Sequence, residues 1–554
     1  MCRRCLAYFS ILRRRIALQI RAIGLAPAEN LYSHAAVERR RCSGAERSVA
    51  AMALATVLSR VAGLLRDSVL FALLGLSEWS GAFLFAFTVP NLFRRMLGEG
   101  ALSSAMVPLF SETLKKHSLG EAFAFLNRLL SRLCVFLSLA LCAAAVAFLL
   151  GYNFLSDRWL RALSLSLLLA PYLLAVCLSA MVCGALNVLG SFGLPALTAL
   201  LLNGAMVGAG LCALVLCPSG GLGAALFLCG GVLAGGAGQL AFSGFLLRRY
   251  GWRFRWDWSP CPLLGRLWSL FLPALLGAAM VQINGTVSRL LAFWLTADGI
   301  STLYLSSRLV ELPLGIFAVA VVSVAFPALS RSASARDGES FARAYGHAYR
   351  SILMVTVPSA IGLILLGGPI LTVLFGWGNC SAEDLARTLP VLRLSAAGIP
   401  FFALAGLHSR AFHAHQDMGT PVRIAAATVA VNLLLTVLLV KPFGAAGIAS
   451  ANLLSAVLQC ILLRQRAVRS WGREFFFAGG AGRALAWANG ALAALLLSIG
   501  HFSPAAGRAN RLETLLWLAL SISAAVLSYG LLLRRMGFGE VSLLFAPFDF
   551  LRRK

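Results

Sequence analysis

The chain has 554 residues, of which 59% are hydrophobic and only 12% are charged. A soluble protein of this length carries about a quarter charged residues, so the composition excludes an ordinary soluble globular protein. The net charge of +27 does not indicate a nucleic-acid-binding protein, because the basic residues lie mainly in short connections and near the N-terminus. We therefore predict an all-α integral membrane protein.

Residues 1–47 are predicted to form a basic cytoplasmic extension. The segment RRCLAYFSILRRRIALQIRAIG has an apolar patch that is too short to span a bilayer, and it lacks a small-residue cleavage site. One interpretation is a basic amphipathic helix on the inner leaflet. The other, which we favour, is an extension that the functional protein does not require.

From residue 48 onward, apolar stretches of roughly 20 residues recur along the chain, and each can cross a bilayer about 30 Å thick. The sequence predicts fourteen helices, at about 48–75, 80–110, 124–151, 159–186, 194–216, 221–248, 264–297, 300–329, 348–376, 385–413, 420–440, 444–466, 479–500 and 513–535.

Arginine is distributed unevenly among the connections. Every second connection is rich in arginine, for example LLRRYGWRFRWDW and RQRAVRSWGRE. The connections between them, such as CPSGG and VKPFG, contain little arginine. Arg-rich connections face the cytoplasm by the positive-inside rule. Both termini, including the tail 536–554, are therefore predicted to be cytoplasmic.

An internal repeat relates the two halves of the chain. Its landmarks recur at offsets between 219 and 229: Arg60 with Arg289, Pro90 with Pro313, Pro108 with Pro327, and Asn203 with Asn432. This repeat predicts two six-helix lobes, 48–250 and 264–470, with a site between them and helices 13 and 14 at 479–535 outside the repeat.

Four arginines fall within the predicted helices 1, 2 and 8: Arg60, Arg66, Arg94 and Arg308. An arginine at the centre of a membrane costs about 3 kcal/mol on insertion scales. Such side chains are tolerated where they line a water-filled cavity or meet counter-charges. These arginines are therefore the candidate binding residues.

Nearby carboxylates neutralise only part of this charge. Asp67 follows Arg66, Glu311 comes three residues after Arg308, and Glu99 comes four residues after Arg95 on the same helical face. The alternative to a ligand-binding role is an arginine that only reaches the membrane interface or forms a structural ion pair. We favour this alternative for Arg95 alone. The remaining positive excess predicts an anionic ligand.

The guanidinium group holds phosphate through two parallel hydrogen bonds. A ligand for this site must also reach the interior of a bilayer. A lipid-linked phosphate or pyrophosphate meets both conditions.

Several motifs resemble one known family. LSRVAGLLRDSVL, TVPNLFRRMLGEGALSSAMVPLFSE and LYLSSRLVELPLGIFAVAVVSVAFPALSR are similar to signatures of the MurJ (MviN) family, and the likeness runs from about residue 48 to the end. The resemblance implies a fourteen-helix fold of the multidrug/oligosaccharidyl-lipid/polysaccharide exporter superfamily. It also implies a flippase that moves lipid II, the undecaprenyl-pyrophosphate-linked peptidoglycan precursor, to the outer leaflet of the bacterial inner membrane.

The resemblance also implies roles for particular residues. The four candidate arginines match the family's cavity arginines, which are proposed to hold the pyrophosphate, and Arg95 and Glu99 match its second-helix motif. Asp67 and Glu311 are supporting residues. The resemblance leaves open whether the protein also binds cell-wall synthesis or division proteins.

The chain departs from the family at four positions. Gly81 stands where an acid is usual, with Glu78 as a candidate substitute one turn away, and Thr88 and Ser307 replace a basic and an acidic residue. Ser288 replaces an acid that binds sodium in some members.

We therefore expect neither a metal nor another cofactor. Asp417 remains a weak candidate for a sodium ligand, and it is better explained as a residue of a cytoplasmic turn. MCRRC is a lone C-x-x-C without a second pair, which indicates neither a zinc site nor a redox motif.

The expected mechanism is alternating access without covalent chemistry. One alternative is export of another lipid-linked glycan, or of drugs, on the same fold, although drug cations would require acidic cavity residues. A membrane enzyme would need acids or histidines in outer loops, and these are short here. A non-transporting scaffold would leave the intramembrane arginines unexplained.

Overall fold

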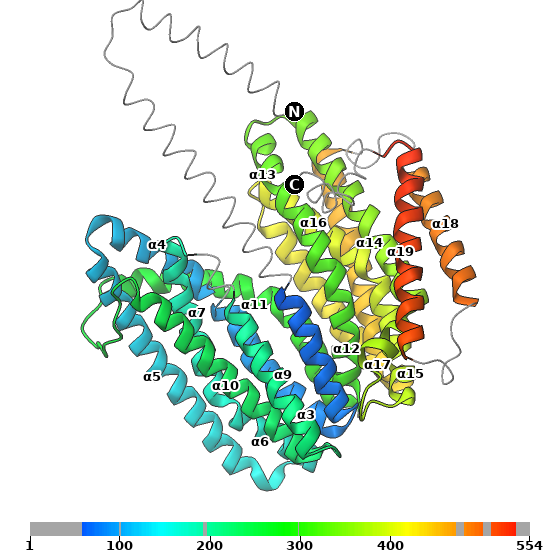
Figure 1. The fold of residues 1–554 in the computed structure, drawn as a ribbon. Helices are drawn as coiled ribbons and strands as arrows, with labels where there is room; N and C mark the ends of the chain where they lie inside the picture. Colours follow the sequence, from blue (N-terminus) through cyan, green and yellow to red (C-terminus); the bar gives the residue numbers. More distant parts are fainter. Residues whose placement is uncertain are drawn as a thin grey trace, which may run out of the picture.

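A computed structural model describes residues 58–98, 101–191, 197–296, 298–472, 481–501 and 511–538. Within these ranges the regular structure is entirely helical (Figure 1). The predicted all-α class is confirmed. Glu99, the extension 1–47 and the end of the tail lie outside the described residues.

The first half of the chain begins with a helix over 58–74. It continues through α3 (Glu78–Phe93), the π-helical turn η1 (Arg94–Gly98), α4 (Ala101–Lys116), α5 (Leu119–Gly151), η2 (Tyr152–Phe154), α6 (Asp157–Leu168), α7 (Ala170–Val188), α9 (Thr198–Leu216) and α10 (Gly221–Arg248).

The second half contains α11 (Leu263–Leu295), α12 (Gly299–Pro313), the π-helical turn η3 (Leu314–Ala318), α13 (Val319–Ser334), α14 (Gly338–Phe375), α15 (Ala382–Ala397), α16 (Ile399–Ala414) and α17 (Gly419–Trp471). Two further helices follow, α18 (Ala481–His501) and α19 (Arg511–Arg535).

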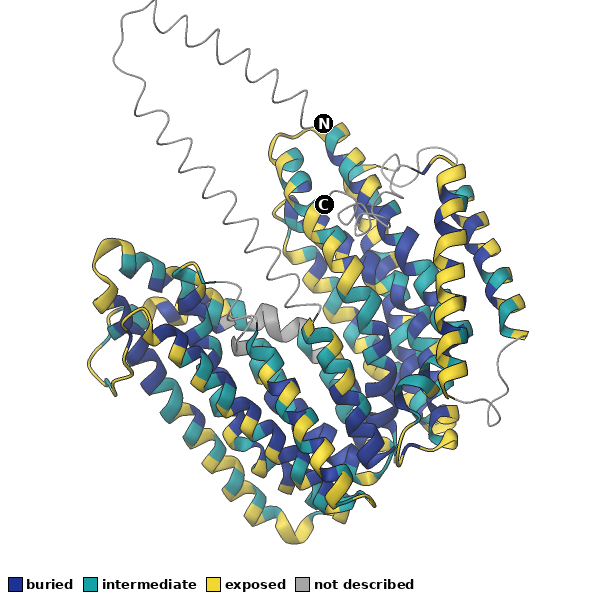
Figure 2. Cartoon of the chain, in the orientation of Figure 1, coloured by how far each residue is buried: buried dark blue, intermediate teal, exposed yellow. Residues whose placement is uncertain are grey.

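Ten helical segments of the described chain are long and apolar enough to cross a membrane. One of them, α17, is 53 residues long and covers two predicted spans, which meet at Gly444, where φ is 54° and the helix is kinked. Many outward-facing side chains of α5 and α19 are exposed (Figure 2), as expected for helices that face lipid. The number of fourteen helices stays a prediction.

The helices form two groups in Figure 1, with α5, α6, α7, α9 and α10 in one and α13 to α17 in the other. The pair α18 and α19 lies at the outer side of the second group and packs on α14. The groups meet at one end and separate toward the other. This arrangement is compatible with the predicted lobes, whose boundaries stay a prediction.

Two prolines precede the two π-helical turns. Pro90 lies near the end of α3, just before η1, and Pro313 is the last residue of α12, just before η3. Proline removes a helical hydrogen bond and crowds the preceding turn, so a local change in helical winding is expected there. The two turns begin 220 residues apart in the chain, within the offsets of the sequence repeat.

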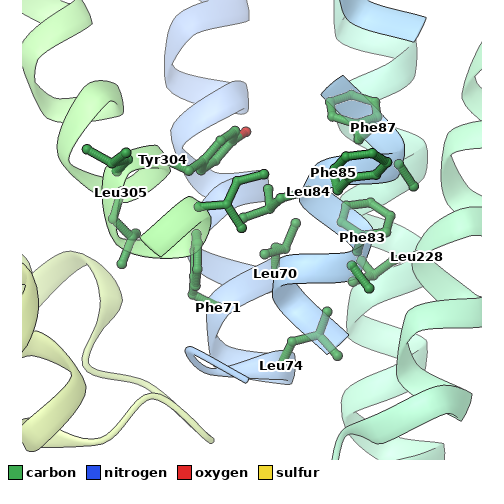
Figure 3. Close-up of a cluster of buried hydrophobic side chains, with 14 of the residues drawn as sticks. Leu70, Phe71, Leu74, Phe83, Leu84, Phe85, Phe87, Leu228, Tyr304 and Leu305 are labelled. Carbon is green, nitrogen blue, oxygen red and sulfur yellow. The ribbon is translucent and has the colours of Figure 1, made fainter. Parts of the chain in front are cut away.

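A buried cluster joins elements of both helix groups next to the candidate site. Figure 3 shows Leu70 and Phe71 of the helix 58–74 beside Phe83 and Phe87 of α3 and Tyr304 of α12. These side chains are almost fully buried. The cluster fixes the helix that carries Arg66 and Asp67 relative to α12.

Asn379 in the α14–α15 connection closes the end at which the groups meet. Its backbone N–H donates to the Ala72 carbonyl oxygen at 2.8 Å, and its side-chain amide donates to the Leu73 carbonyl oxygen at 2.7 Å. The neighbouring Gly378 has a φ of 55°, and a Cβ there would overlap the Ala72 carbonyl group. We call this set of interactions the Asn379 contact.

Candidate functional site

A cavity of about 440 Å³ lies between the helix groups. Its walls come from the helix 58–74, α3, η1, α9, α10 and α12. Its charged lining consists of Arg60, Arg66, Asp67, Arg94, Arg95, Arg308 and Glu311, and Asn91, Asn203 and Gln239 add amide groups. All four candidate arginines therefore lie at one cavity, which we call the central cavity.

Arg66 is held rigidly in the wall of this cavity. It is only 7% exposed and donates from Nη2 to Asp67 Oδ1 at 2.6 Å. It also donates to Asn203 Oδ1 and to the Tyr304 hydroxyl, each at 3.1 Å. A buried arginine with this many partners is fixed in position. Arg66 can therefore contribute its charge and position its neighbours.

Arg308 links α12 to the helix 58–74. Its Nη2 donates to the Tyr304 hydroxyl at 2.7 Å, and its Nη1 donates to Glu311 Oε2 at 3.0 Å. Its Nε lies 3.0 Å from Asp67 Oδ2, which is close enough for an ion pair although the atoms are not aligned for a hydrogen bond. Asp67, only 1% exposed, thus lies between two arginines from different halves of the chain.

Arg60 and Arg289 approach Glu311 from opposite halves. Arg60 Nη1 donates to the Glu311 carbonyl oxygen at 3.3 Å, and Arg289 Nη2 lies 3.8 Å from Glu311 Oε1. Arg60 and Arg289 are also counterparts in the sequence repeat. Glu311 therefore contacts arginines of both halves, Arg60 through its backbone carbonyl oxygen and Arg289 through its carboxylate.

Arg94 and Arg95 lie in η1, directly after α3. Both are half-buried and line the central cavity, and Arg94 Nε donates to Asn91 Oδ1 at 3.3 Å. The proline before η1 and the wider π-helical turn place these two successive arginines at the cavity. Arg95 lies at the cavity beside Arg94, although the sequence favoured a purely structural role for it.

Arginines outnumber carboxylates among the described cavity residues, with five against two. The wall therefore has the positive excess that the sequence predicted, and Asn203 and Gln239 add amide groups. Such a lining suits an anion with several oxygen acceptors, as phosphate and pyrophosphate are. The proposed binding role of each arginine stays a prediction.

The sequence alone did not indicate that Tyr304, Asn203 and Arg289 belong to the site. Tyr304 precedes Arg308 by one helical turn, and its hydroxyl donates to Asp67 Oδ1 at 3.0 Å. Asn203 and Arg289 were marked as repeat landmarks without a function. The repeat, which pairs Arg289 with the candidate residue Arg60, was the signal that could have identified Arg289.

Glu78, the candidate substitute for an acid at Gly81, lies away from the central cavity. Glu78 forms an ion pair with Arg161 of α6 and does not belong to the cavity lining. Gly81 packs toward Ile300 and Phe293, at ordinary van der Waals distances for an added Cβ. Ser307 donates to the Tyr304 carbonyl oxygen, within its own helix.

Ser288, which replaces a sodium-binding acid of the family, and Asp417, the weak candidate ligand, both make structural hydrogen bonds. Ser288 Oγ donates to Asn452 Oδ1 at 3.1 Å, and Asp417 Oδ1 accepts the Thr420 N–H at 2.9 Å at the start of α17. Hydrogen bonds from the side chain and backbone of Thr420 hold the pKa of Asp417 below its ordinary value. No cluster of three potential metal-ligating side chains occurs in the described part of the chain.

The helical architecture and the buried basic cavity define a polytopic membrane protein with a transporter fold. The fold is similar to a solved structure of the lipid II flippase MurJ in an inward closed conformation, with a TM-score of 0.71 and 24% identity, covering 88% of this chain and 99% of that one. It is also similar to an inward-facing multidrug resistance MATE family transporter of the MOP superfamily, with a TM-score of 0.59 and 12% identity, covering 74% and 95% of the two chains.

The sequence comparisons are more specific. The model of the family "Lipid II flippase MurJ" matches residues 70–503. A probable lipid II flippase MurJ of Haemophilus influenzae is 32% identical over 430 residues, covering 74% of this chain and 83% of the relative. One from Thermotoga maritima is 32% identical over 434 residues, covering 77% and 86%. The chain belongs to the MurJ family.

Proposed function

We propose that this protein translocates lipid II from the cytoplasmic to the outer leaflet of the bacterial inner membrane, for peptidoglycan synthesis. The observation that carries the proposal is a cavity in which five arginines and two carboxylates converge, in a chain of the MurJ family. Lipid II combines a pyrophosphate with a polyprenyl tail. The pyrophosphate suits the arginines, and the tail can remain in the lipid.

The arginines have different proposed tasks. Arg60, Arg94 and Arg308 are half-buried at the cavity and bind the pyrophosphate oxygens, and Arg95 adds charge beside them. Arg66 is more deeply buried and holds Asp67 and Tyr304 in place. Glu311 and Asp67 keep the guanidinium groups apart and oriented while the cavity is empty.

Transport proceeds by alternating access between the two lobes. The Asn379 contact lies at the end where the helix groups meet, and the groups separate toward the opposite end (Figure 1). With both termini in the cytoplasm, as the arginine-rich connections predict, the closed end faces outward. The pyrophosphate enters from the cytoplasmic side, and breaking the contacts at the outer end releases it outside.

Translocation needs no bond to form or break in the substrate, so the proposed activity is transport rather than catalysis. The bound pyrophosphate replaces carboxylate partners of the arginines with its own oxygens. The negative charge of the pyrophosphate gives the loaded cavity a different net charge from the empty one. This difference couples occupancy of the cavity to the arrangement of the lobes.

Complementation tests the proposal. In a conditional bacterial mutant without its own lipid II flippase, the wild-type chain should restore growth. Arg94→Ala and Arg308→Ala should fail at the same membrane level, and Arg343→Ala should restore growth, because Arg343 is exposed at the start of α14. Failure of the wild type despite normal membrane insertion would refute lipid II transport and favour another lipid-linked glycan.

A further inference from the structure

The connection between α10 and α11, residues 249–262, carries an exposed row of aromatic and basic side chains. Phe254, Trp256 and Trp258 are 47%, 58% and 55% exposed. Arg253 and Arg255 alternate with them and are also exposed. We call these five residues the aromatic–arginine row.

The segment is held firmly on α5 although its rings are exposed. The Trp252 indole N–H donates to Asn127 Oδ1 at 2.9 Å, and the Asn127 amide donates to the Arg253 carbonyl oxygen at 3.1 Å. Farther along, Arg132 donates to the Ser259 carbonyl oxygen at 2.7 Å. The backbone on both sides of the row is therefore anchored, and the exposure of the rings does not come from an unattached loop.

The only acid of the connection is already engaged. Asp257 Oδ2 accepts from Arg128 Nε at 3.0 Å, and Asp257 Oδ1 accepts the Ser259 N–H at 2.9 Å. Hydrogen bonds from Ser259, together with Arg128, hold the pKa of Asp257 below its ordinary value. Arg253 and Arg255 are exposed and take no part in this pair, so the row presents positive charge.

The position of α5 places the row at a membrane boundary. The chain of α5 is uncharged from Leu133 to Gly151, a length of roughly 28 Å that matches the hydrocarbon core. Arg132 directly precedes this stretch, and its guanidinium lies 5.2 Å from the centre of the Trp258 ring. Phe136, one turn farther on, is largely exposed, as a lipid-facing residue would be. Trp258 therefore lies at the level where hydrocarbon gives way to headgroups.

We propose that the aromatic–arginine row is a binding surface for anionic phospholipids of the adjoining leaflet. Tryptophan and phenylalanine rings partition to the membrane interface, and arginines hold lipid phosphates through paired hydrogen bonds. The charge complementarity selects anionic over zwitterionic headgroups. This proposal does not depend on what the central cavity transports.

Site-specific photo-crosslinking of the full-length chain in lipid nanodiscs tests this proposal. The photoreactive residue p-benzoylphenylalanine replaces Trp256, and the nanodiscs contain labelled phosphatidylglycerol or labelled phosphatidylcholine at equal fractions. Crosslinking at Trp256 should favour phosphatidylglycerol. The same residue at Trp487, an exposed position on α18, should show no such preference and controls for general contact with lipid.

Charge removal provides the matched comparison. Arg253→Gln with Arg255→Gln should reduce the phosphatidylglycerol adduct at Trp256 by roughly tenfold, because each basic residue near an anionic surface contributes several-fold to binding. Arg466→Gln with Arg469→Gln removes two exposed arginines from the end of α17 and should leave the adduct unchanged. Thermal unfolding of each variant verifies that it is folded.

Three outcomes would overturn the proposal. Equal crosslinking of both lipids would mean that the row is only an apolar anchor. An unchanged adduct in the Arg253→Gln/Arg255→Gln variant would mean that these arginines do not select the headgroup. Crosslinking to protein in place of lipid would mean that the row is a protein contact.

Discussion

Tyr304 is the residue on which the charges of the central cavity converge. Its hydroxyl accepts from Arg66 and Arg308 and donates to Asp67, so a single oxygen atom has three charged partners from two helices. The phenol orients both guanidinium groups while its ring remains in the buried cluster (Figure 3). Tyr304 is therefore a positioning residue for the proposed binding arginines.

Replacing Tyr304 with phenylalanine should impair transport more than folding. Tyr304→Phe keeps the ring but removes three hydrogen bonds to charged groups, and we expect a loss of about 1–3 kcal/mol in stability. Lipid II transport should fall several-fold at matched membrane levels. The control is Tyr529→Phe on α19, whose buried hydroxyl donates to the Met354 carbonyl oxygen away from the cavity. If both variants transport equally well, Tyr304 has no positioning role.

The geometry of Arg308 predicts that its charge alone is insufficient. The Arg308 guanidinium contacts Tyr304, Asp67 and Glu311 through different nitrogen atoms, and a lysine ammonium cannot reach all three in this arrangement. Arg308→Lys should therefore lower transport by roughly tenfold, a change of about 1.4 kcal/mol. Arg387→Lys, which alters an exposed ion pair on α15, should have no effect. Normal transport by Arg308→Lys would contradict this assignment.

The π-helical turns are the elements that shape the cavity. η1 carries Arg94 and Arg95, and η3 lies against Arg60, since a Cβ added at Gly315 would meet the Arg60 guanidinium. Both turns follow a proline that the sequence repeat had matched, Pro90 and Pro313. A local departure from regular helix thus occurs twice, at corresponding places, where charged groups enter the membrane interior.

The Asn379 contact predicts a measurable difference between two glycines. Gly378 and Gly221 both have a positive φ, but a Cβ at Gly378 would overlap the Ala72 carbonyl group, whereas a Cβ at Gly221 would meet open space. Gly221→Ala should cost about 1 kcal/mol from backbone strain alone. Gly378→Ala should lower the unfolding temperature further and reduce transport. Equal unfolding temperatures would show that the close approach does not stabilise the end at which the helix groups meet.

The sequence predicted the positions of helices better than the contacts between side chains. The span 221–248 agrees with α10, because a long apolar run with flanking glycine and arginine marks its ends. The kinked α17 was predicted as two helices, which the backbone joins through Gly444. The π-helical turns were missed, because apolar periodicity does not specify a change of winding.

The same limit applies to the site. The arginines could be predicted because charges within apolar runs are conspicuous in one dimension. The interaction of Asp67 with Tyr304 and Arg308 could not, because it joins residues 237 or more positions apart in the chain. The ion pair of Glu78 could not be predicted for the same reason, since its partner Arg161 lies on another helix.

At the scale of the whole molecule, we expect the net charge of the cavity to link transport to the membrane potential. The described cavity residues carry a positive excess, and each charge that crosses the membrane field is worth about 2.3 kcal/mol per 100 mV. We therefore expect an inside-negative potential to favour return of the empty cavity toward the cytoplasm.

Dissipating the potential should slow lipid II transport several-fold in cells that depend on this chain. A potassium ionophore is the appropriate agent, and an electroneutral proton–potassium exchanger, which removes the pH gradient and keeps the potential, should have little effect. The opposite pattern would assign the driving force to protons.

The central claim is that the arginines of one cavity carry lipid II across the membrane. The most direct measurement is the amount of lipid II exposed at the outer surface of cells whose only flippase is this chain, read by an added enzyme that cleaves the exposed precursor. Cells with the wild-type chain should yield cleaved lipid II, and cells with Arg94→Ala or Arg308→Ala at matched levels should accumulate uncleaved precursor inside. Equal cleavage in all three would contradict the claim.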